Sequence, residues 1–271
     1  MNYIFYHSNC MDGLCACWVT FDALQNKMCV EESDITIQAV HYNNPLPDFD
    51  YQKDDTVYIV DFSYPREILL ALAEKCNVVV LDHHKSAEKQ LQDLPFAFFD
   101  MNKSGAGMAW WYFHRDAPMP TVVQMIQDRD LWKFELPGTK AFSAAFQDDP
   151  RRHDMDFWTC MMNDYGIVRV IIEKGVIFLE QLDGILKNFI EKKKYKIITW
   201  HGCQVALFNT TSLMSEMGEY AYQHLPVDFS MSYFINNSGK VIFSLRAPKG
   251  GVSVSEIAEQ FGGGGHAEPW R

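Results

Sequence analysis

The first half of the chain alternates short apolar runs with stretches in which apolar residues recur at helical spacing. The apolar runs predict strands at 3–7, 35–41, 56–60 and 78–81. The stretches between them predict helices at 13–24 and 66–75. The run at 78–81 is wholly apolar, as is typical of a strand buried on both faces of a parallel sheet. Alternating strands and helices therefore predict an open, mostly parallel α/β sheet.

The second half predicts a helical segment followed by a smaller group of strands. Helices are expected at 107–113, 122–127 and 168–194. Strands are expected at 197–200, 205–209, 229–235 and 241–246, with the turn sequence 236–239 joining the last two. A final helix is expected at 253–261, with Ser253 and Glu256 spaced as in a capping box. We therefore expect an α/β domain at 1–150, a helical connector at 151–195 and a smaller α/β domain at 196–271.

The composition is that of an ordinary globular protein, with 48% hydrophobic and 22% charged residues. A formal net charge of −11 argues against a protein that coats long nucleic acids by charge. The seven cysteines show no disulfide-like spacing, and the N-terminal sequence lacks a signal-peptide pattern. No apolar run approaches the roughly 18 residues of a membrane span. These observations predict a cytoplasmic protein without membrane or long nucleic-acid partners.

Residues that carry chemistry follow three of the predicted strands. His7 ends the first strand, Asp61 follows the third, and Asp82, His83 and His84 follow the fourth. Because ligands of open α/β sheets bind beyond the carboxyl ends of the strands, these side chains should converge on one edge. Two adjacent histidines joined to an aspartate favour a metal or phosphate site over a satisfied core histidine, since imidazole is a common metal ligand.

The turn after the first strand adds further candidates. His7, Cys10 and Asp12 supply imidazole, thiol and carboxylate groups, all of which can bind metals. A plain alternative is that His7 and Asp12 cap the following helix. Asp61 also has a structural alternative, an Asx turn that introduces Pro65.

Asp128 and Asp130 follow an apolar helix, and either carboxylate could complete a metal site. The alternative is a solvated salt-bridge cluster with Arg129. Taken together, the oxygen and nitrogen ligands suit manganese or magnesium better than a thiolate-bound structural zinc. Two such ions, roughly 3.5–4 Å apart, would activate a water and clamp a phosphate, which predicts phosphoester hydrolysis.

Three further segments could bind the anionic part of a substrate. Ser104 precedes a helix whose first amides could hold an anion, although a cap and a tight turn explain it equally well. The glycine run at 262–265, including Gly263, Gly264 and Gly265, exposes backbone amides next to His266. Arg246 ends a strand upstream and could bind a phosphate in bidentate fashion. A flexible tail is the alternative for the glycine run.

With these motifs assembled, the chain resembles the DHH phosphoesterase superfamily. The matching segments run in the family's order over almost the whole chain, as HSNCMDG, VDFSYP, LDHHKSAE, QDRDLW and VSVSEIAEQFGGGGH. The resemblance implies a catalytic domain, a helical connector and a DHH-associated C-terminal domain, with a cleft between the two domains.

The resemblance also implies a role for each candidate residue. One metal would be held by His7, Asp61 and the residue at position 10, and the other by Asp12, Asp61, His83 and Asp128. His84 would face the scissile phosphate, while Arg246, the glycine run and His266 would grip the substrate. The chain departs from the family at Cys10, where the family has an aspartate, and it ends at Arg271, where the family continues into another strand.

We therefore expect hydrolysis of short oligonucleotides or small nucleotides with two divalent metal ions, manganese first, with magnesium or cobalt as alternatives. Cleavage of polyphosphate or pyrophosphate is a second hypothesis. Base-stacking aromatic residues in the cleft would favour nucleotides, whereas lysine and arginine alone would favour polyphosphate. A third hypothesis is a nucleotide-binding protein whose activity Cys10 has impaired. The oligomeric state stays open, with a homodimer as one option.

Overall fold

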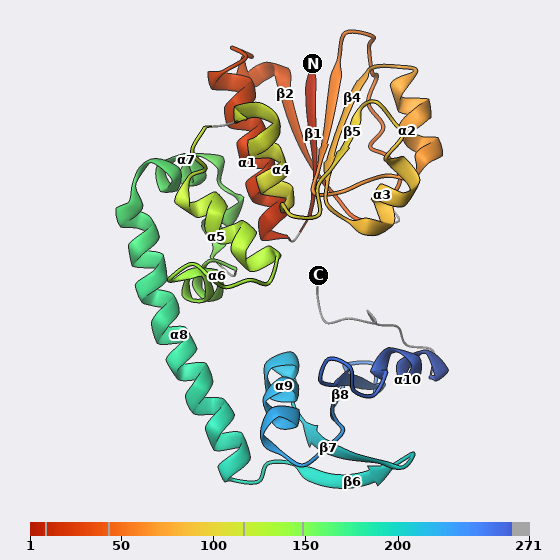
Figure 1. Ribbon diagram of the computed structural model, residues 1–271, viewed down its shortest axis with the longest axis vertical. Helices are drawn as coiled ribbons and strands as arrows, with labels where there is room; N and C mark the ends of the chain where they lie inside the picture. The colour runs from red at the N-terminus through yellow and green to blue at the C-terminus, as the bar shows by residue number, and fades with distance from the viewer. Residues whose placement is uncertain (9, 43, 116, 148, 262–271) are drawn as a thin grey trace. The chain divides into compact units, whose positions relative to one another are not determined.

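A computed structural model describes residues 1–8, 10–42, 44–115, 117–147 and 149–261 of the chain. The chain forms two compact units, Met1–Phe178 and Leu179–Arg271 (Figure 1). The division falls within the long helix α8 (Tyr165–Glu191), inside the segment expected to act as a connector. The mixed α/β architecture and the parallel sheet expected from the sequence are confirmed.

The first unit is built on a five-stranded parallel sheet in the order β2-β1-β3-β4-β5. The strands are β1 (Asn2–His7), β2 (Ile35–Val40), β3 (Thr56–Val60), β4 (Asn77–Asp82) and β5 (Ala97–Phe99). Tyr6 pairs with Val60, which pairs with Leu81, so the carboxyl ends of the three central strands lie side by side. This strand order places a topological switch point between β1 and β3, where such sheets bind ligands.

Helices cover both faces of this sheet (Figure 1). One face carries α1 (Met11–Asn26) and α4 (Gly105–His114), and the other carries α2 (Arg66–Ala73) and α3 (Lys85–Leu91). Successive strand residues point to opposite faces, so that Ile4 joins the core under α1 while Phe5 joins the core under α2. The apolar runs are therefore buried on both sides, as a parallel sheet requires.

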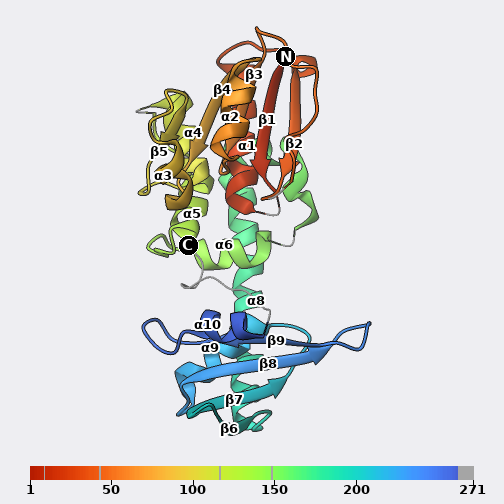
Figure 2. The same ribbon diagram turned by 90° about the vertical axis from the view of Figure 1, so that its right-hand side faces the viewer.

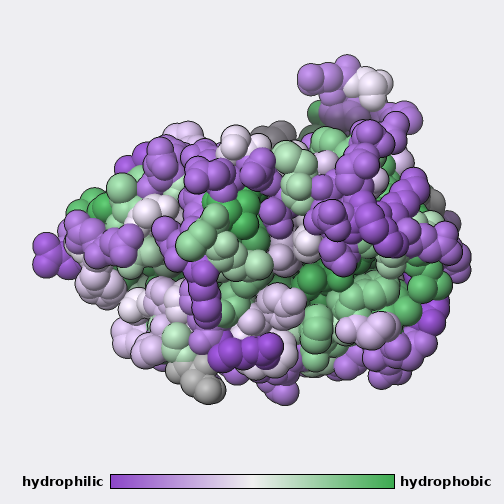
Figure 3. All heavy atoms as spheres, turned by 90° about the horizontal axis from the view of Figure 1, so that it is seen from above, coloured by the Kyte–Doolittle hydropathy of each residue, from purple (hydrophilic) through white to green (hydrophobic). Residues whose placement is uncertain are grey.

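A group of shorter helices packs beside α1 and α4. It comprises α5 (Thr121–Asp130), α6 (Thr139–Phe146), η2 (Pro150–His153) and α7 (Met155–Asn163). The short η1 (Glu32–Asp34) lies elsewhere, directly before β2. Trp158 is fully buried in the same core as α1 and donates its Nε1 hydrogen to the carbonyl oxygen of Arg152. Seen from above in Figure 3, polar and apolar side chains are interspersed over the surface.

The second unit contains a four-stranded mixed sheet in the order β6-β7-β8-β9 (Figure 2). Its elements after α8 are β6 (Lys196–Trp200), β7 (Cys203–Asn209), α9 (Met214–His224), β8 (Phe229–Ile235), β9 (Val241–Arg246) and α10 (Val254–Gln260). Ala206 packs with α9 and Val205 with α10, so these helices cover opposite faces. The hairpin between β8 and β9 is confirmed, with Gly239 at a φ of +78°.

Within the described ranges, no helix combines the length and the apolar composition that crossing a membrane would require.

Candidate metal centre

The candidate site lies at the carboxyl edge of the first sheet, at the switch point between β1 and β3. His7 is the last residue of β1, Asp61 follows β3 directly, and Asp82 is the last residue of β4. Cys10 is the N-cap residue of α1, and Asp12 lies in the first turn of that helix. The convergence of strand ends expected from the sequence is therefore present, because the parallel register brings these ends together.

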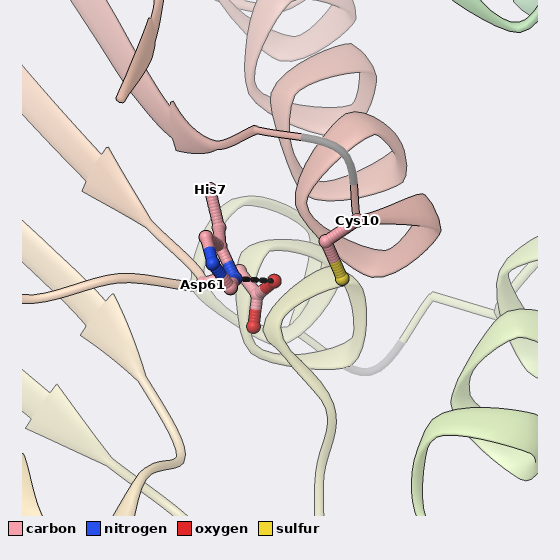
Figure 4. A group of neighbouring side chains, drawn as sticks. All are labelled: His7, Cys10 and Asp61. Atoms are coloured by element: carbon pink, nitrogen blue, oxygen red, sulfur yellow. Dashed lines mark ion pairs between the residues drawn. The ribbon is translucent and has the colours of Figure 1, made fainter. Parts of the chain in front are cut away.

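One group of metal-ligating atoms comes from His7, Cys10 and Asp61 (Figure 4). These atoms all lie within 4.8 Å of one another. The Asp61 side chain is only 1% exposed, and its Oδ2 atom has no hydrogen-bond partner among the described residues. Nδ1 of His7 is 3.7 Å from this oxygen. The group could hold a metal ion.

A second group joins Asp12, His83 and Asp130. The Nε2 atom of His83 lies 3.9 Å from Asp12 Oδ2, 3.5 Å from Asp130 Oδ2 and 3.2 Å from Asp61 Oδ1. In the described part of the chain, Asp130 Oδ2 is also buried without a hydrogen-bond partner. A third group, Asp61 with His83 and His84, shares residues with both of the others. The three groups therefore form one continuous centre around Asp61 and His83.

Asp12 is held in place by the start of α4. Its carboxylate accepts hydrogen bonds from the backbone amides of Gly105 and Ala106, the latter at 3.1 Å. The helix N-terminus thus binds an internal carboxylate, as helix ends bind external anions. Ser104, expected to contact substrate, is instead fully buried, and its hydroxyl caps α4 by accepting a hydrogen bond from Gly107. Ser104 therefore has a structural role, the alternative weighed above.

Asp82 orients His84, which follows it by two residues. Its carboxylate is fully buried and accepts hydrogen bonds from the amides of His83 and His84 and from the hydroxyl of Ser63. The same carboxylate lies 2.6 Å from Nδ1 of His84. Burial disfavours the charged imidazole, but this Asp82 contact raises the pKa of His84. Asp82 is therefore a positioning residue, which leaves Nε2 of His84 for another partner.

Asp128 does not join the centre, contrary to the expectation from the family resemblance. Its carboxylate accepts hydrogen bonds from the amides of Glu135 and Leu136 and from the hydroxyl of Thr139. Burial disfavours the ionised carboxylate, but these bonds hold the pKa of Asp128 below its ordinary value. Asp130 takes the place in the centre. Residues two positions apart on a helix, such as Asp128 and Asp130, point about 200° apart, so only one of them can face a given neighbour.

The electrostatics of the centre favour added positive charge. Burial, together with the charges of Asp130 and Asp61, raises the pKa of Asp12 well above its ordinary value. Burial and the Asp61 charge also raise the pKa of Asp130 to about 6. Burial opposes the charged form of His83, but Asp61 and its acidic neighbours raise the pKa of His83 to about 10. Carboxylates this close and this buried repel one another, and a divalent cation would relieve the repulsion.

Close backbone approach also shapes the centre. A Cβ atom on Gly105 would lie 2.4 Å from Cβ of Asp61, and one on Gly13 would lie 2.4 Å from the carbonyl oxygen of His7. Both positions therefore require glycine. Sequence reasoning gave neither a role in the site, since Gly105 and Asp61 are far apart in the chain and no local pattern joins them.

An aromatic groove beside the centre was also missed. The ring of Tyr42 lies 5.2 Å from His7, 6.2 Å from His84 and 4.8 Å from Phe62, between ring centroids. A groove of about 460 Å³ starts at this ring, and its lining includes Pro45, Phe62, Tyr64, Pro65 and Ile68. Among its described lining residues there is no lysine or arginine. Tyr42 lies in the loop after β2, where no periodic pattern marks it.

The remaining candidates lie in the second unit. Arg246 ends β9 and donates to the hydroxyl of Ser215 at 2.7 Å and to the carbonyl oxygen of Leu245 at 2.8 Å. Gly263, Gly264, Gly265 and His266 lie outside the described residues. The structure thus brings together the candidates of the first unit, except for Ser104 and Asp128.

Known proteins offer limited comparison. No protein-family model matches the sequence. An uncharacterized protein of Acanthamoeba polyphaga mimivirus is 30% identical over 276 residues, which cover 97% of this chain. The chain spans 65% of the length of that relative. A crystal structure of an uncharacterized protein from Helicobacter pylori is 16% identical with a TM-score of 0.46, covering 99% of this chain and 91% of that one.

Proposed function

We propose that this chain is a metal-dependent phosphodiesterase of the DHH type that hydrolyses short oligonucleotides or small nucleotides. One observation carries the proposal. Two groups of metal-ligating side chains, one with Cys10 and one with Asp130, are joined by a third group, in which Asp61 of the first lies beside His83 of the second. A carboxylate placed between two such groups, as Asp61 is with its Oδ1 atom 3.2 Å from Nε2 of His83, is what a pair of divalent ions sharing a ligand requires.

The residues present fit two divalent ions. His7, Cys10 and Asp61 would hold one, and Asp12, His83 and Asp130 would hold the other, with Asp61 available to both. The unpartnered Oδ2 atoms of Asp61 and Asp130 would gain a partner. Manganese is the first choice for the second group, since imidazole and carboxylate ligands suit it. When bound, the ions would supply Lewis-acid stabilisation of the phosphate and activate a water.

The chain's own residues orient the reacting groups. Asp82 fixes Nδ1 of His84, so that the opposite nitrogen, Nε2, is left for a substrate. When protonated, His84 would donate a hydrogen bond from Nε2 to a phosphate oxygen and offset part of its charge. Gly13 and Gly105 keep the backbone close enough for His7, Asp12 and Asp61 to share one small space.

The aromatic groove favours nucleotides over polyphosphate. Its Tyr42 ring is 47% exposed and lies beside His84, where a group attached to the scissile phosphate would extend. Aromatic rings bind nucleobases by stacking, whereas a chain of phosphates calls for lysine and arginine. The net charge of −11 favours a short substrate over a long one.

The test is release of nucleoside monophosphate from di- to pentanucleotides by the metal-depleted protein reloaded with manganese. Pyrophosphate and polyphosphate are assayed in parallel. Asp130→Asn should lower kcat/KM by at least about 10–100-fold, because loss of a ligand should cost no less than loss of a supporting contact. Asp54→Asn, which changes an exposed aspartate of the same unit, is the matched control. Metal binding without turnover of any of these substrates would refute the hydrolase proposal and favour a binding protein.

A further inference from the structure

We infer that the two halves of the centre select different metals. The group of His7, Cys10 and Asp61 takes a thiophilic divalent ion, Zn²⁺, whereas the group of Asp12, His83 and Asp130 takes Mn²⁺ or Mg²⁺. The inference rests on the metal centre of the proposed function and goes beyond it by assigning a separate ion to each half.

The donor atoms of the two halves differ in kind. Figure 4 shows the side chains of His7 and Cys10 on either side of the Asp61 carboxylate. This half offers one sulfur, one imidazole nitrogen and one carboxylate oxygen, a mixture that suits zinc. The other half offers only nitrogen and oxygen, which hard cations such as manganese accept readily. Three protein ligands are also the usual number in a zinc site that keeps a position open.

An unpartnered buried oxygen points independently to a ligand in the first half. Asp61 is 1% exposed, and its Oδ2 atom faces Nδ1 of His7 at 3.7 Å, beyond hydrogen-bond distance. No other described group bonds to that oxygen. A buried polar atom without a partner is costly unless an ion or water completes it. A carboxylate oxygen of Asp61 lies within 4.8 Å of the ligand atoms of His7 and Cys10, so a cation among them would reach this carboxylate.

Cys10 has no structural task that explains its place. It is the N-cap residue of α1, and its side chain makes no capping hydrogen bond. Serine, threonine, asparagine and aspartate cap helices far better than other residues do. Cys15 and Cys17, by contrast, are fully buried in the core on the same helix. Cys10 is partly buried and turned towards the carboxylates, so its sulfur is available to a metal.

Zinc binding at this group requires the thiolate form of Cys10. The thiol proton passes to solvent as the Zn–S bond forms, so that binding releases one proton.

The experiment uses the full chain, depleted of metal and titrated with Co²⁺. Cobalt bound to a thiolate shows a strong sulfur-to-metal charge-transfer absorption in the near ultraviolet, whereas cobalt bound to nitrogen and oxygen does not. We expect this band at one of two bound ions, and its loss in both Cys10→Asp and Cys10→Ser. Cys29→Ser, which changes an exposed cysteine, should leave the band intact. With Zn²⁺ limited to one equivalent per chain and Mn²⁺ in excess, the unmutated protein should retain one ion of each kind, whereas Cys10→Asp should retain less Zn²⁺.

A second readout uses the unmutated protein. Zn²⁺ should protect Cys10 from alkylation, detected by peptide mass mapping, while the exposed Cys29 and Cys160 react regardless. Two bound cobalt ions without the band, or a band that persists in Cys10→Asp, would overturn the metal assignment and leave the hydrolase proposal standing. Failure to bind any divalent ion would overturn both.

Discussion

Gly105 offers a sharp test of how tightly the centre is built. In Gly105→Ala the added Cβ would lie 2.4 Å from Cβ of Asp61 and 2.8 Å from its Cγ and Oδ1. Carbon atoms in contact prefer separations of about 3.5–4.0 Å, so the two segments must move apart by roughly 1 Å or more. The Cβ of Asp61 is fixed to its backbone and cannot swing away. Overpacking of this kind costs about 1–3 kcal/mol.

Gly105→Ala should impair catalytic activity more than it impairs the stability of the fold. A displacement of about 1 Å at a reacting centre can cost about 100-fold in rate, and Asp61 belongs to the first half of the metal centre while lying 3.2 Å from His83 of the second. We therefore expect a loss of at least about 100-fold in kcat/KM. The loss of stability should lower Tm by roughly 2–12 °C for a unit of this size. Weaker manganese binding, measured by calorimetric titration, should accompany both effects.

Two other glycines provide graded controls. In Gly107→Ala the new Cβ would meet the end of the Gln127 side chain, which can rotate away, so the effect should be smaller. In Gly184→Ala, within α8, nothing among the described residues lies within 4 Å of the new Cβ. That change should stabilise the helix by about 0.5–1 kcal/mol. If Gly105→Ala binds manganese and turns over substrate as Gly184→Ala does, close packing against Asp61 is not required and the reasoning fails.

Four further predictions follow from the contacts around the centre. Asp128→Asn should cost about 1–3 kcal/mol of stability but keep both metals, whereas Asp130→Asn should lose one metal, as elemental analysis would show; equal metal loss in both would contradict the assignment. Asp82→Asn should lower activity about 10–100-fold with metal retained, because His84 loses its orientation; unchanged kcat would count against a positioning role. Tyr42→Ala should raise KM for dinucleotides about 10-fold, from roughly 1–3 kcal/mol of stacking, while Tyr42→Phe should not; equal KM values would remove the base-binding role of the groove. Because the pKa of Asp130 is raised to about 6, the metal-free protein should lose stability as pH rises from about 4 to 6, and manganese should reverse this loss; a rise in unfolding midpoint over that range would refute it.

The sequence predicts those parts of the centre that strand ends determine. His7, Asp61 and His83 each follow a recognisable apolar strand, and parallel strands must bring their carboxyl ends to one edge. The choice between Asp128 and Asp130 was not predictable in this way. It depends on the direction in which the end of α5 faces, and this is set by packing rather than by local pattern.

Contacts between segments that lie far apart in the sequence were not predictable either. Gly105 touches Asp61 only because α4 packs across the ends of β3 and β4. The short elements β5, α3, α6 and α9 were not predicted, because few apolar residues at a regular spacing mark them. In α9, Gly218 and Ala221 are the only buried residues, and small side chains give a weak hydrophobic signal.

Because Asp12 occupies the first backbone amides of α4, metal ions and substrate should bind in a fixed order. The Asp12 carboxylate already occupies the positive end of the α4 dipole, so this helix N-terminus is not available to bind the phosphate of a substrate. A substrate approaching the metal-depleted protein would meet the carboxylates of Asp12, Asp61 and Asp130, whose negative charge His83 and His84 offset only in part. We therefore expect an ordered binding sequence. The divalent cations bind first, and nucleotides show no measurable affinity for the protein until the cations are bound.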